Sequence, residues 1–328
     1  HDLAVVAEIA DKIVVMQNGQ IVETAKTEVL LYNMKHPYTR ALFNASTHRV
    51  VMPDVITSGT LLSVDSVVRT YSLPRNGVLG SRPNFNALDN VSFNISHGER
   101  VGLVGESGCG KSTLTRAILG VEDVQSGWIK LDGEPVFSGK RPNIDVRRKM
   151  QVVFQDPYSS FNPRHRVDRL IAEPLHVLEN PPVGKLKDLA ILKALEDVGL
   201  MGSDAKKFIH EFSGGQRQRI AIARALIIEP ELIIFDEAVS ALDVSVRAQV
   251  LDLIAELCHK RPLAYLFISH DLSVVRTVTD RVMIMRAGKI VEHGETEKVF
   301  TNPQNAYTKT LIAAAPRLPE ITYAIEPV

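Results

Sequence analysis

Cysteine is almost absent from this chain. Its 328 residues include two cysteines, Cys109 and Cys258, which lie far apart in the sequence. This count excludes a disulfide framework and a cysteine-rich metal or iron–sulfur site. A reducing, cytosolic compartment fits this cysteine usage best.

Net charge and long apolar runs are also missing. Lys plus Arg and Asp plus Glu each number 38, so the total charge gives no support to electrostatic binding of nucleic acid or anionic lipid. The longest apolar candidate, 220–228, is interrupted by Arg224 and falls short of the ~18–20 residues of a membrane span. The first residues do not form the basic-then-apolar pattern of a signal peptide, so we expect none here. It begins with His1, so we expect its N-terminus to be a cut.

A glycine-rich loop separates an apolar segment, 100–104, from a predicted helix start at 114–119. The loop matches the phosphate-binding pattern GxxxxGK[ST], in which Lys111 reaches the terminal phosphates and the Ser112 hydroxyl holds Mg²⁺. Glycines let successive N–H groups face phosphate oxygens. A glycine-rich turn that binds nothing is the alternative, but a chance match is on the order of one per cent. The predicted triphosphate-binding residues are Gly105, Glu106, Ser107, Gly108, Cys109, Gly110, Lys111, Ser112 and Thr113.

Two carboxylates end a later apolar strand, 232–235. Such a pair can be no more than a solvated strand end, but after a phosphate loop the functional interpretation dominates. Asp236 would hold Mg²⁺ directly or through water. Glu237 would orient and deprotonate the attacking water. Together with the loop, these residues indicate a P-loop NTPase.

A serine and two glycines open a predicted helix over 216–228. The serine is a good N-cap, and the same amides could bind a second phosphate. At this motif the chain resembles the ATP-binding-cassette (ABC) family, whose LSGGQ sequence has Phe212 here in place of its leucine. In that family the motif closes over ATP held by the other cassette of a dimer. The resemblance therefore implies that four residues act in trans: Ser213, Gly214, Gly215 and Gln216.

The resemblance implies roles for four further residues. Gln155 would be the Q-loop glutamine that contacts Mg²⁺ or the water, and His270 the switch histidine that touches the γ-phosphate. Asp243 would belong to the D-loop, and Tyr71 would stack on adenine. A polar loop residue and a half-buried aromatic are the alternatives for Gln155 and Tyr71, but their order among the other motifs favours the functional roles.

The two ends of the chain repeat one another. Positions 1–42 align without a gap with 270–311 and give 17 identities, where chance gives roughly two or three. Each copy reads as a short helix, a strand, a tight turn and a second strand. By this repeat, His1 would be the switch histidine of a first cassette. We expect residues 1–45 to be its C-terminal remnant in an N-terminally truncated tandem protein, 46–60 a linker, 61–300 a complete second cassette and 301–328 a C-terminal extension.

Strands alternate with helices along most of the chain, which argues for an α/β fold with a largely parallel sheet. The segment from about 156 to 213 differs, because 168–178 and 186–198 are both helix-like. It reads as an inserted helical subdomain. The resemblance implies the P-loop NTPase fold of an ABC cassette, which adds an antiparallel β subdomain. Residues 73–86 predict an exposed loop.

A narrower resemblance concerns the oligopeptide and dipeptide importers. Residues 154–164 look like their Q-loop sequence, 36–42 look like their C-terminal segment, and 305–311 is a diverged second copy. Some members carry a cysteine-bound iron–sulfur cluster near this segment. This chain has no cysteine there, so we predict no cluster.

These resemblances imply an ATPase subunit of a bacterial importer for peptides or related small solutes, using ATP and Mg²⁺ at the cytoplasmic face of the plasma membrane. The implied partners are a second ABC cassette, two membrane permeases and, indirectly, a solute-binding protein; nucleic acid is not expected. Two alternatives remain: a soluble tandem cassette protein that acts on ribosomes or DNA, and an inactive truncated product. Without its first cassette, the chain is expected to bind Mg-ATP but to hydrolyse it poorly.

Overall fold

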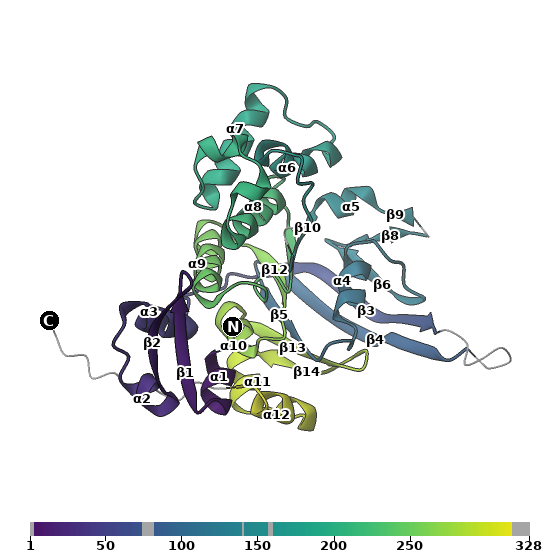
Figure 1. Cartoon of the computed structure of the whole chain (residues 1–328). Helices are drawn as coiled ribbons and strands as arrows, with labels where there is room; N and C mark the ends of the chain where they lie inside the picture. Colours follow the sequence, from purple (N-terminus) through teal and green to yellow (C-terminus); the bar gives the residue numbers. More distant parts are fainter. Residues whose placement is uncertain (1–2, 74–81, 140, 157–159, 317–328) are drawn as a thin grey trace.

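The computed structural model describes residues 3–73, 82–139, 141–156 and 160–316, and its centre is a six-stranded sheet (Figure 1). The strand order is β10-β11-β12-β5-β13-β14, in which the first five strands are parallel and β14 is antiparallel to β13. Every residue of β5 and β12 is buried, as in parallel sheets covered on both faces. The strands are β5 (Arg100–Val104), β10 (Met150–Phe154), β11 (Leu232–Asp236), β12 (Ala264–Ile268), β13 (Arg281–Arg286) and β14 (Lys289–Glu295).

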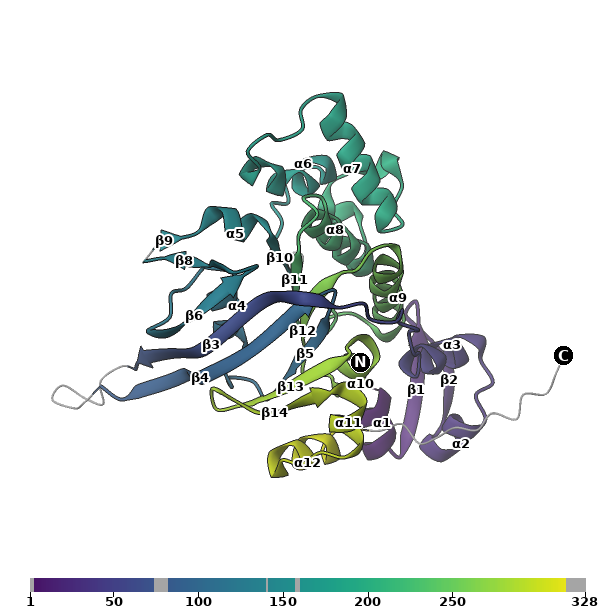
Figure 2. The ribbon, with the colours of Figure 1, turned by 180° about the vertical axis from the view of Figure 1, so that it is seen from behind.

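Side chains of the central strands alternate between two apolar cores. In β12, Tyr265 and Phe267 belong to one core, whereas Leu266 and Ile268 belong to the other. This period of two is the pleat of a β-strand. Helices cover both faces of the sheet (Figures 1 and 2), and the predicted α/β fold is confirmed. The covering helices are α4 (Lys111–Ile118), α5 (Ile144–Arg148), α8 (Gly214–Leu226), α9 (Val244–Lys260) and α10 (Leu272–Val278).

A second, antiparallel sheet shares a core with α4 and the central sheet. Its order is β4-β3-β6-β7, and β3 and β4 span 15 and 14 residues. Both are well above the usual strand length of about five or six residues. Several shifts of register keep β3 and β4 paired beyond the alternating segments. The strands are β3 (Ser58–Ser72), β4 (Asn84–His97), β6 (Ser126–Leu131) and β7 (Glu134–Pro135), followed by the small pair β8 (Phe137–Ser138) and β9 (Arg141–Pro142).

Helices fill the segment between β10 and α8. The helix predicted over 168–178 is two elements, because Pro174 has no amide hydrogen to continue an α-helix. The helix predicted over 186–198 is α7. Leu170, Ile171 and Leu195 join the core that includes α8, so this layer packs onto the sheet domain. Its elements are α6 (Val167–Ile171), α7 (Lys185–Asp197) and the 3₁₀ helices η1 (Glu173–Val177), η2 (Gly202–Lys206) and η3 (Ile209–Glu211).

The two ends of the chain have the same local fold. Both strand pairs, β1–β2 and β13–β14, shift register at equivalent positions, after Val15 and after Ile284. The Glu23 carboxylate accepts hydrogen bonds from the amides of residues 35 and 36, and the Glu292 carboxylate accepts them from the amides of 304 and 305. The first copy consists of α1 (Leu3–Ile9), β1 (Lys12–Gln17), β2 (Gln20–Lys26), α2 (Thr27–Tyr32) and α3 (Pro37–Ser46). The second copy consists, in the same order, of α10, β13, β14, α11 (Thr296–Thr301) and α12 (Ala306–Ala313).

The surroundings of these two units differ. β13 pairs with β5, whereas among the described strands β1 has one partner, β2, in a separate two-stranded sheet. Met285 on β13 is fully buried, and its counterpart Met16 on β1 is 56% exposed. Helix α3 of the first unit packs against α9 (Figure 2). Just after α3, the His48 Nε2 atom lies 2.7 Å from the Asp252 Oδ1 atom on α9.

None of the described helices has the length and apolarity needed to cross a bilayer.

Candidate nucleotide-binding site

The predicted phosphate loop joins β5 to α4. Gly110 is the N-cap of α4 and has a φ of +116°, a conformation that glycine adopts without strain. A Cβ atom at Gly110 would lie 2.2 Å from the carbonyl oxygen of Ala87, and one at Gly105 would lie 2.2 Å from that of Met285. The backbone on either side of the loop therefore requires glycine at both positions, before any ligand is considered.

The Lys111 ammonium group lies inside this loop. Its Nζ donates hydrogen bonds to the carbonyl oxygens of Gly105, at 2.7 Å, and Glu106, at 3.1 Å, and the residue is only 8% exposed. Loop carbonyls thus replace water around a buried charge. Anionic oxygens are stronger acceptors than carbonyls, so phosphate can compete for this ammonium group.

Four predicted site residues meet in one open cleft of about 450 Å³ beside the loop. The parallel register sets Phe154 beside Asp236, so the residues that follow, Gln155 and Glu237, leave the sheet at the same edge. The cleft is lined by Ser112, Phe154, Gln155, Asp236 and Glu237, together with Asp156 and Ser160.

Asp236 is held in an unfavourable environment for a carboxylate. Burial raises its pKa, and the neighbouring Glu237 raises it further, while Lys111 and Arg116 act in the opposite direction. A divalent cation would favour the ionised form. Hydroxyl, amide and carboxylate oxygens are ligands that suit Mg²⁺; Ser112, Gln155 and Asp236 therefore fit the predicted metal site.

Glu237 is joined to His270. The Glu237 Oε2 atom lies 2.7 Å from the His270 Nδ1 atom, and the histidine side chain is 63% exposed. Glu237 has a left-handed φ of +55°, and its amide donates to the carbonyl oxygen of Ile268 at 2.9 Å. The ends of β11 and β12 thus position this pair, of which Glu237 lines the cleft.

Ser213 and Gln216 form a reciprocal cap at the start of α8. The Ser213 amide donates to Gln216 Oε1 at 3.0 Å, and the Gln216 amide donates to Ser213 Oγ at 3.4 Å. Gly214 and Gly215 lie between them, and these four residues are not among those lining the cleft. Asp243 caps α9 by accepting from the Val246 amide at 2.9 Å.

Comparison with known families agrees with this geometry. The family described as "ABC transporter" matches residues 88–240. This chain belongs to that family. A second family, "Oligopeptide/dipeptide transporter, C-terminal region", matches both ends of the ABC chain, at residues 22–51 and 291–326.

Curated relatives include two Escherichia coli K12 proteins. The chain is 42% identical over 343 residues to the glutathione import ATP-binding protein GsiA, covering 96% of this chain and 55% of the relative. It is 42% identical over 315 residues to the uncharacterized ABC transporter ATP-binding protein YejF, covering 95% and 59%. The chain thus spans little more than half the length of these relatives.

Solved cassettes share the fold. The ATP-binding cassette MJ0796, in a dimeric post-hydrolysis state bound to ADP and Pi, is 26% identical with a TM-score of 0.62, covering 72% of this chain and 99% of that structure. The Clostridium perfringens protein cbiO1, part of the transporter complex cbiONQ, is 26% identical with a TM-score of 0.63, covering 75% and 92%. The predicted ABC cassette fold is confirmed.

Tyr71 lies on β3, beside the strand β4 that reaches the phosphate loop at Ala87. Thr70 pairs with Asn86, which precedes Ala87 at the loop. The Tyr71 hydroxyl lies 2.7 Å from both carboxylate oxygens of Glu122, and the guanidinium carbon of Arg69 lies 5.0 Å from the ring centroid. Burial opposes ionisation of Glu122, but hydrogen bonds from Tyr71 and Arg69 hold the pKa of its carboxyl below the usual value. The sequence prediction included neither Glu122 nor Arg69.

Tyr307 is a further residue at the phosphate loop that the sequence prediction did not include. Its hydroxyl oxygen accepts a hydrogen bond from the Glu106 amide of the phosphate loop at 3.3 Å. The repeat held a signal, because Tyr38 is identical at the equivalent position. His1, predicted as the histidine of a first cassette, lies outside the described residues.

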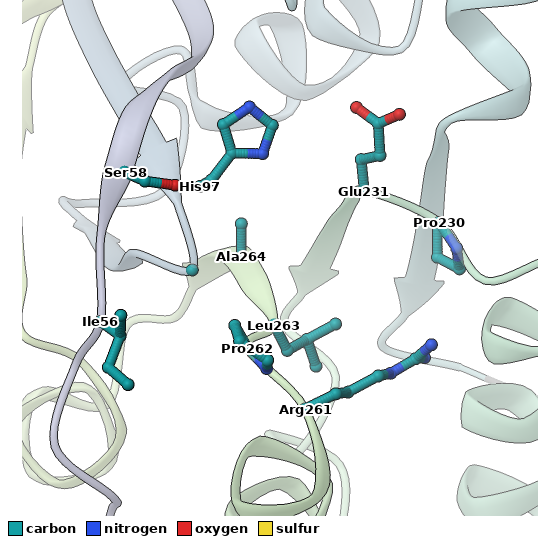
Figure 3. Close-up of a pocket in the computed structure, with 10 residues that line it drawn as sticks. Ile56, Ser58, His97, Pro230, Glu231, Arg261, Pro262, Leu263 and Ala264 are labelled. Carbon is teal, nitrogen blue, oxygen red and sulfur yellow. The ribbon is translucent and has the colours of Figure 1, made fainter.

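A further hollow of about 340 Å³ lies at the other end of the sheet (Figure 3). Two of its charged groups are engaged with residues outside the hollow: His97 lies 3.4 Å from Asp132, and Glu231 lies 3.0 Å from Lys149. Figure 3 shows the Arg261 side chain extending toward Pro230, and the Glu231 carboxylate pointing away from it. Because these groups do not converge on a common point, we assign the hollow no role in nucleotide binding.

Proposed function

We propose that the chain is an ATPase that binds Mg-ATP in the loop Gly105–Thr113. The observation that carries this proposal is the meeting of Ser112, Gln155, Asp236 and Glu237 in one cleft beside the loop. Ser112, Asp236 and Gln155 would hold Mg²⁺, which neutralises phosphate charge when bound. Tyr71 would stack on the adenine.

In this proposal Glu237 takes the proton from the attacking water. The His270 contact at 2.7 Å orients its carboxylate, and the exposed part of His270 remains available to the γ-phosphate. Lys111 would exchange its two loop carbonyls for phosphate oxygens. These side chains work mainly by positioning and by stabilising developing negative charge.

We infer that a complete site needs a second cassette. The exposed start of α8 would present Ser213–Gln216 to a nucleotide on the partner, with Asp243 at the contact between cassettes. We also propose the division into a first-cassette remnant (1–45), a linker (46–60), a second cassette (61–300) and an extension (301–328). One edge of β1 pairs with none of the described strands, whereas the equivalent edge of β13 is covered by β5; this difference supports the first of these assignments.

We further propose that the ATPase drives import of peptides or related small solutes. The match of both chain ends to the oligopeptide/dipeptide transporter region supports this class, as does the relative described as a glutathione importer. The partners would be two membrane permeases and, through them, a solute-binding protein. The chain would then sit peripherally on the cytoplasmic face of the plasma membrane.

Replacing the proposed base tests the reaction. E237Q keeps the size of the side chain and removes its basicity, so we expect hydrolysis to fall by at least about 100-fold while ATP binding persists. The measurement is phosphate release, in parallel with nucleotide affinity, using the chain paired with its first cassette. Turnover at the unmodified rate in E237Q would show that Glu237 is not the base.

Copurification from cells separates transport from the two alternatives. Membrane permeases should be retained with the tagged tandem protein. Retention of ribosomes or DNA in their place would favour a soluble cassette protein. No hydrolysis by the tandem protein would favour an inactive product.

A further inference from the structure

The C-terminal unit forms one wall of the phosphate loop. The Gly288 amide donates to the carbonyl oxygen of Cys109 at 2.9 Å. The carbonyl oxygen of Met285 lies so close to Gly105 that a Cβ atom there would approach it to 2.2 Å. Tyr307, on α12, makes a third contact, with Glu106. The β13–β14 turn and α12 therefore reach the loop from the same side.

The Tyr307 side chain is fixed in place for this contact. The residue is 7% exposed and belongs to the large apolar core, and the Arg286 guanidinium carbon lies 4.6 Å from its ring centroid. Burial raises the pKa of the phenol, so the hydroxyl stays neutral at pH 7. The start of α12 is also fixed, because the Tyr307 amide donates to Asn305 Oδ1 at 2.8 Å.

Glu106 is held from two sides. Its amide donates to Tyr307, while its carbonyl oxygen accepts from Lys111 Nζ at 3.1 Å and from the Cys109 amide at 3.2 Å. When Lys111 turns to phosphate, as the proposed function requires, Glu106 loses one of these contacts. The bond to Tyr307 does not depend on Lys111 and remains.

We propose that Tyr307 is a positioning residue of the nucleotide site, through which the C-terminal segment holds the phosphate loop in its binding conformation. This inference rests on the proposed function of the loop. It gives α12, which lies beyond the ABC transporter match at 88–240, a direct effect on phosphate binding. Tyr307 acts through the Glu106 amide and does not touch the phosphates.

The test is Y307F, which removes one hydroxyl and keeps the ring. A lost hydrogen bond of ordinary strength should weaken binding about 2- to 10-fold. The loss should be equal for Mg-ATP and for inorganic tripolyphosphate, because the substitution affects the phosphate loop and not the contact with adenine. The matched control is Y38F. Tyr38 occupies the equivalent position in the first unit, on α3, which lies far from α4 in both views (Figures 1 and 2). Loss of the Tyr38 hydroxyl should leave the affinities for Mg-ATP and for tripolyphosphate unchanged.

Hydrogen exchange supplies a readout that a general structural role would not give. Y307F should speed exchange at the Glu106 amide and leave exchange in β12 unchanged. Unchanged affinity, loss confined to ATP, or faster exchange throughout the chain would each overturn the inference. K111A separates it from the proposed function: if K111A binds both ligands normally, the loop is not the phosphate site, whatever Y307F does.

Discussion

Adjacent glycines in the Ser213–Gln216 motif are predicted to respond in opposite ways to alanine. A Cβ atom at Gly215 would lie 2.2 Å from Val246 Cγ1 on α9, whereas none of the described atoms lies within 4 Å of a Cβ at Gly214. Carbon atoms pack at about 3.5–4.0 Å, so G215A forces a displacement of more than ~1 Å. Val246 cannot easily rotate away, because β-branched residues in helices are largely confined to one rotamer.

The expected magnitude follows from two opposing effects. Overpacking costs about 1–3 kcal/mol, and alanine in place of glycine in a helix recovers roughly 0.5–1 kcal/mol. G215A should therefore lower the free energy of unfolding by about 0.5–2 kcal/mol. G214A meets no overpacking and should be neutral or slightly stabilising. Urea denaturation of both variants measures the difference.

A second substitution identifies the clash. V246A removes the methyl group that a Cβ at Gly215 would meet, so G215A/V246A should be less destabilised than the sum of its single variants by about 1 kcal/mol. If G215A is as stable as the unmodified chain, or if V246A gives no rescue, packing against α9 is not the reason for this glycine. G214A should fold and bind ATP normally, yet slow hydrolysis in the paired cassettes, since its methyl group would stand at the exposed helix start.

Two further predictions concern the phosphate loop and the contact with adenine. Burial raises the pKa of Cys109 and raises that of Cys258 to about 11, so alkylation of both thiols should be slow near neutral pH and faster as the pH rises. Alkylation of Cys109 should block nucleotide binding, and bound ATP should slow the alkylation of Cys109 but not of Cys258. Equal alkylation rates for Cys109 with and without ATP would contradict this. Y71A should weaken ATP binding about 5- to 100-fold, which is the loss of affinity expected when one base–aromatic stacking contact is removed. Binding of tripolyphosphate should not change, and equal losses of affinity for both ligands would argue against adenine stacking.

The sequence was sufficient to place the loop and the carboxylates, because a phosphate and Mg²⁺ site of the kind proposed would restrict the residue types. Lys111, Ser112 and Asp236 follow from a pattern with a direct chemical reason. Their meeting in one cleft follows from parallel strands that end at the same edge. The central strands were equally predictable, because strands buried on both faces are continuously apolar.

Contacts between distant segments could not be predicted in this way. Nothing local distinguishes Glu122 from a solvated carboxylate, and its bonds to Tyr71 and Arg69 depend on how β3 lies beside the residues after α4. The lengths of β3 and β4 depend on bulges, which leave little trace in an alternating pattern. Gly215 looks like part of a phosphate motif, although its contact with Val246 already requires a small residue.

The repeat separates what a sequence encodes from what its surroundings supply. Met16 and Met285 occupy the same position after the same shift of register, yet one is 56% exposed and the other fully buried. The local fold of the unit is therefore intrinsic, because it forms with and without a neighbouring strand. Burial is not intrinsic, since it comes from β5 beside β13. An exposed apolar edge strand is a liability that proteins ordinarily cover. The apolar side chains of β1 thus favour a partner strand equivalent to β5, as the proposed first cassette would provide.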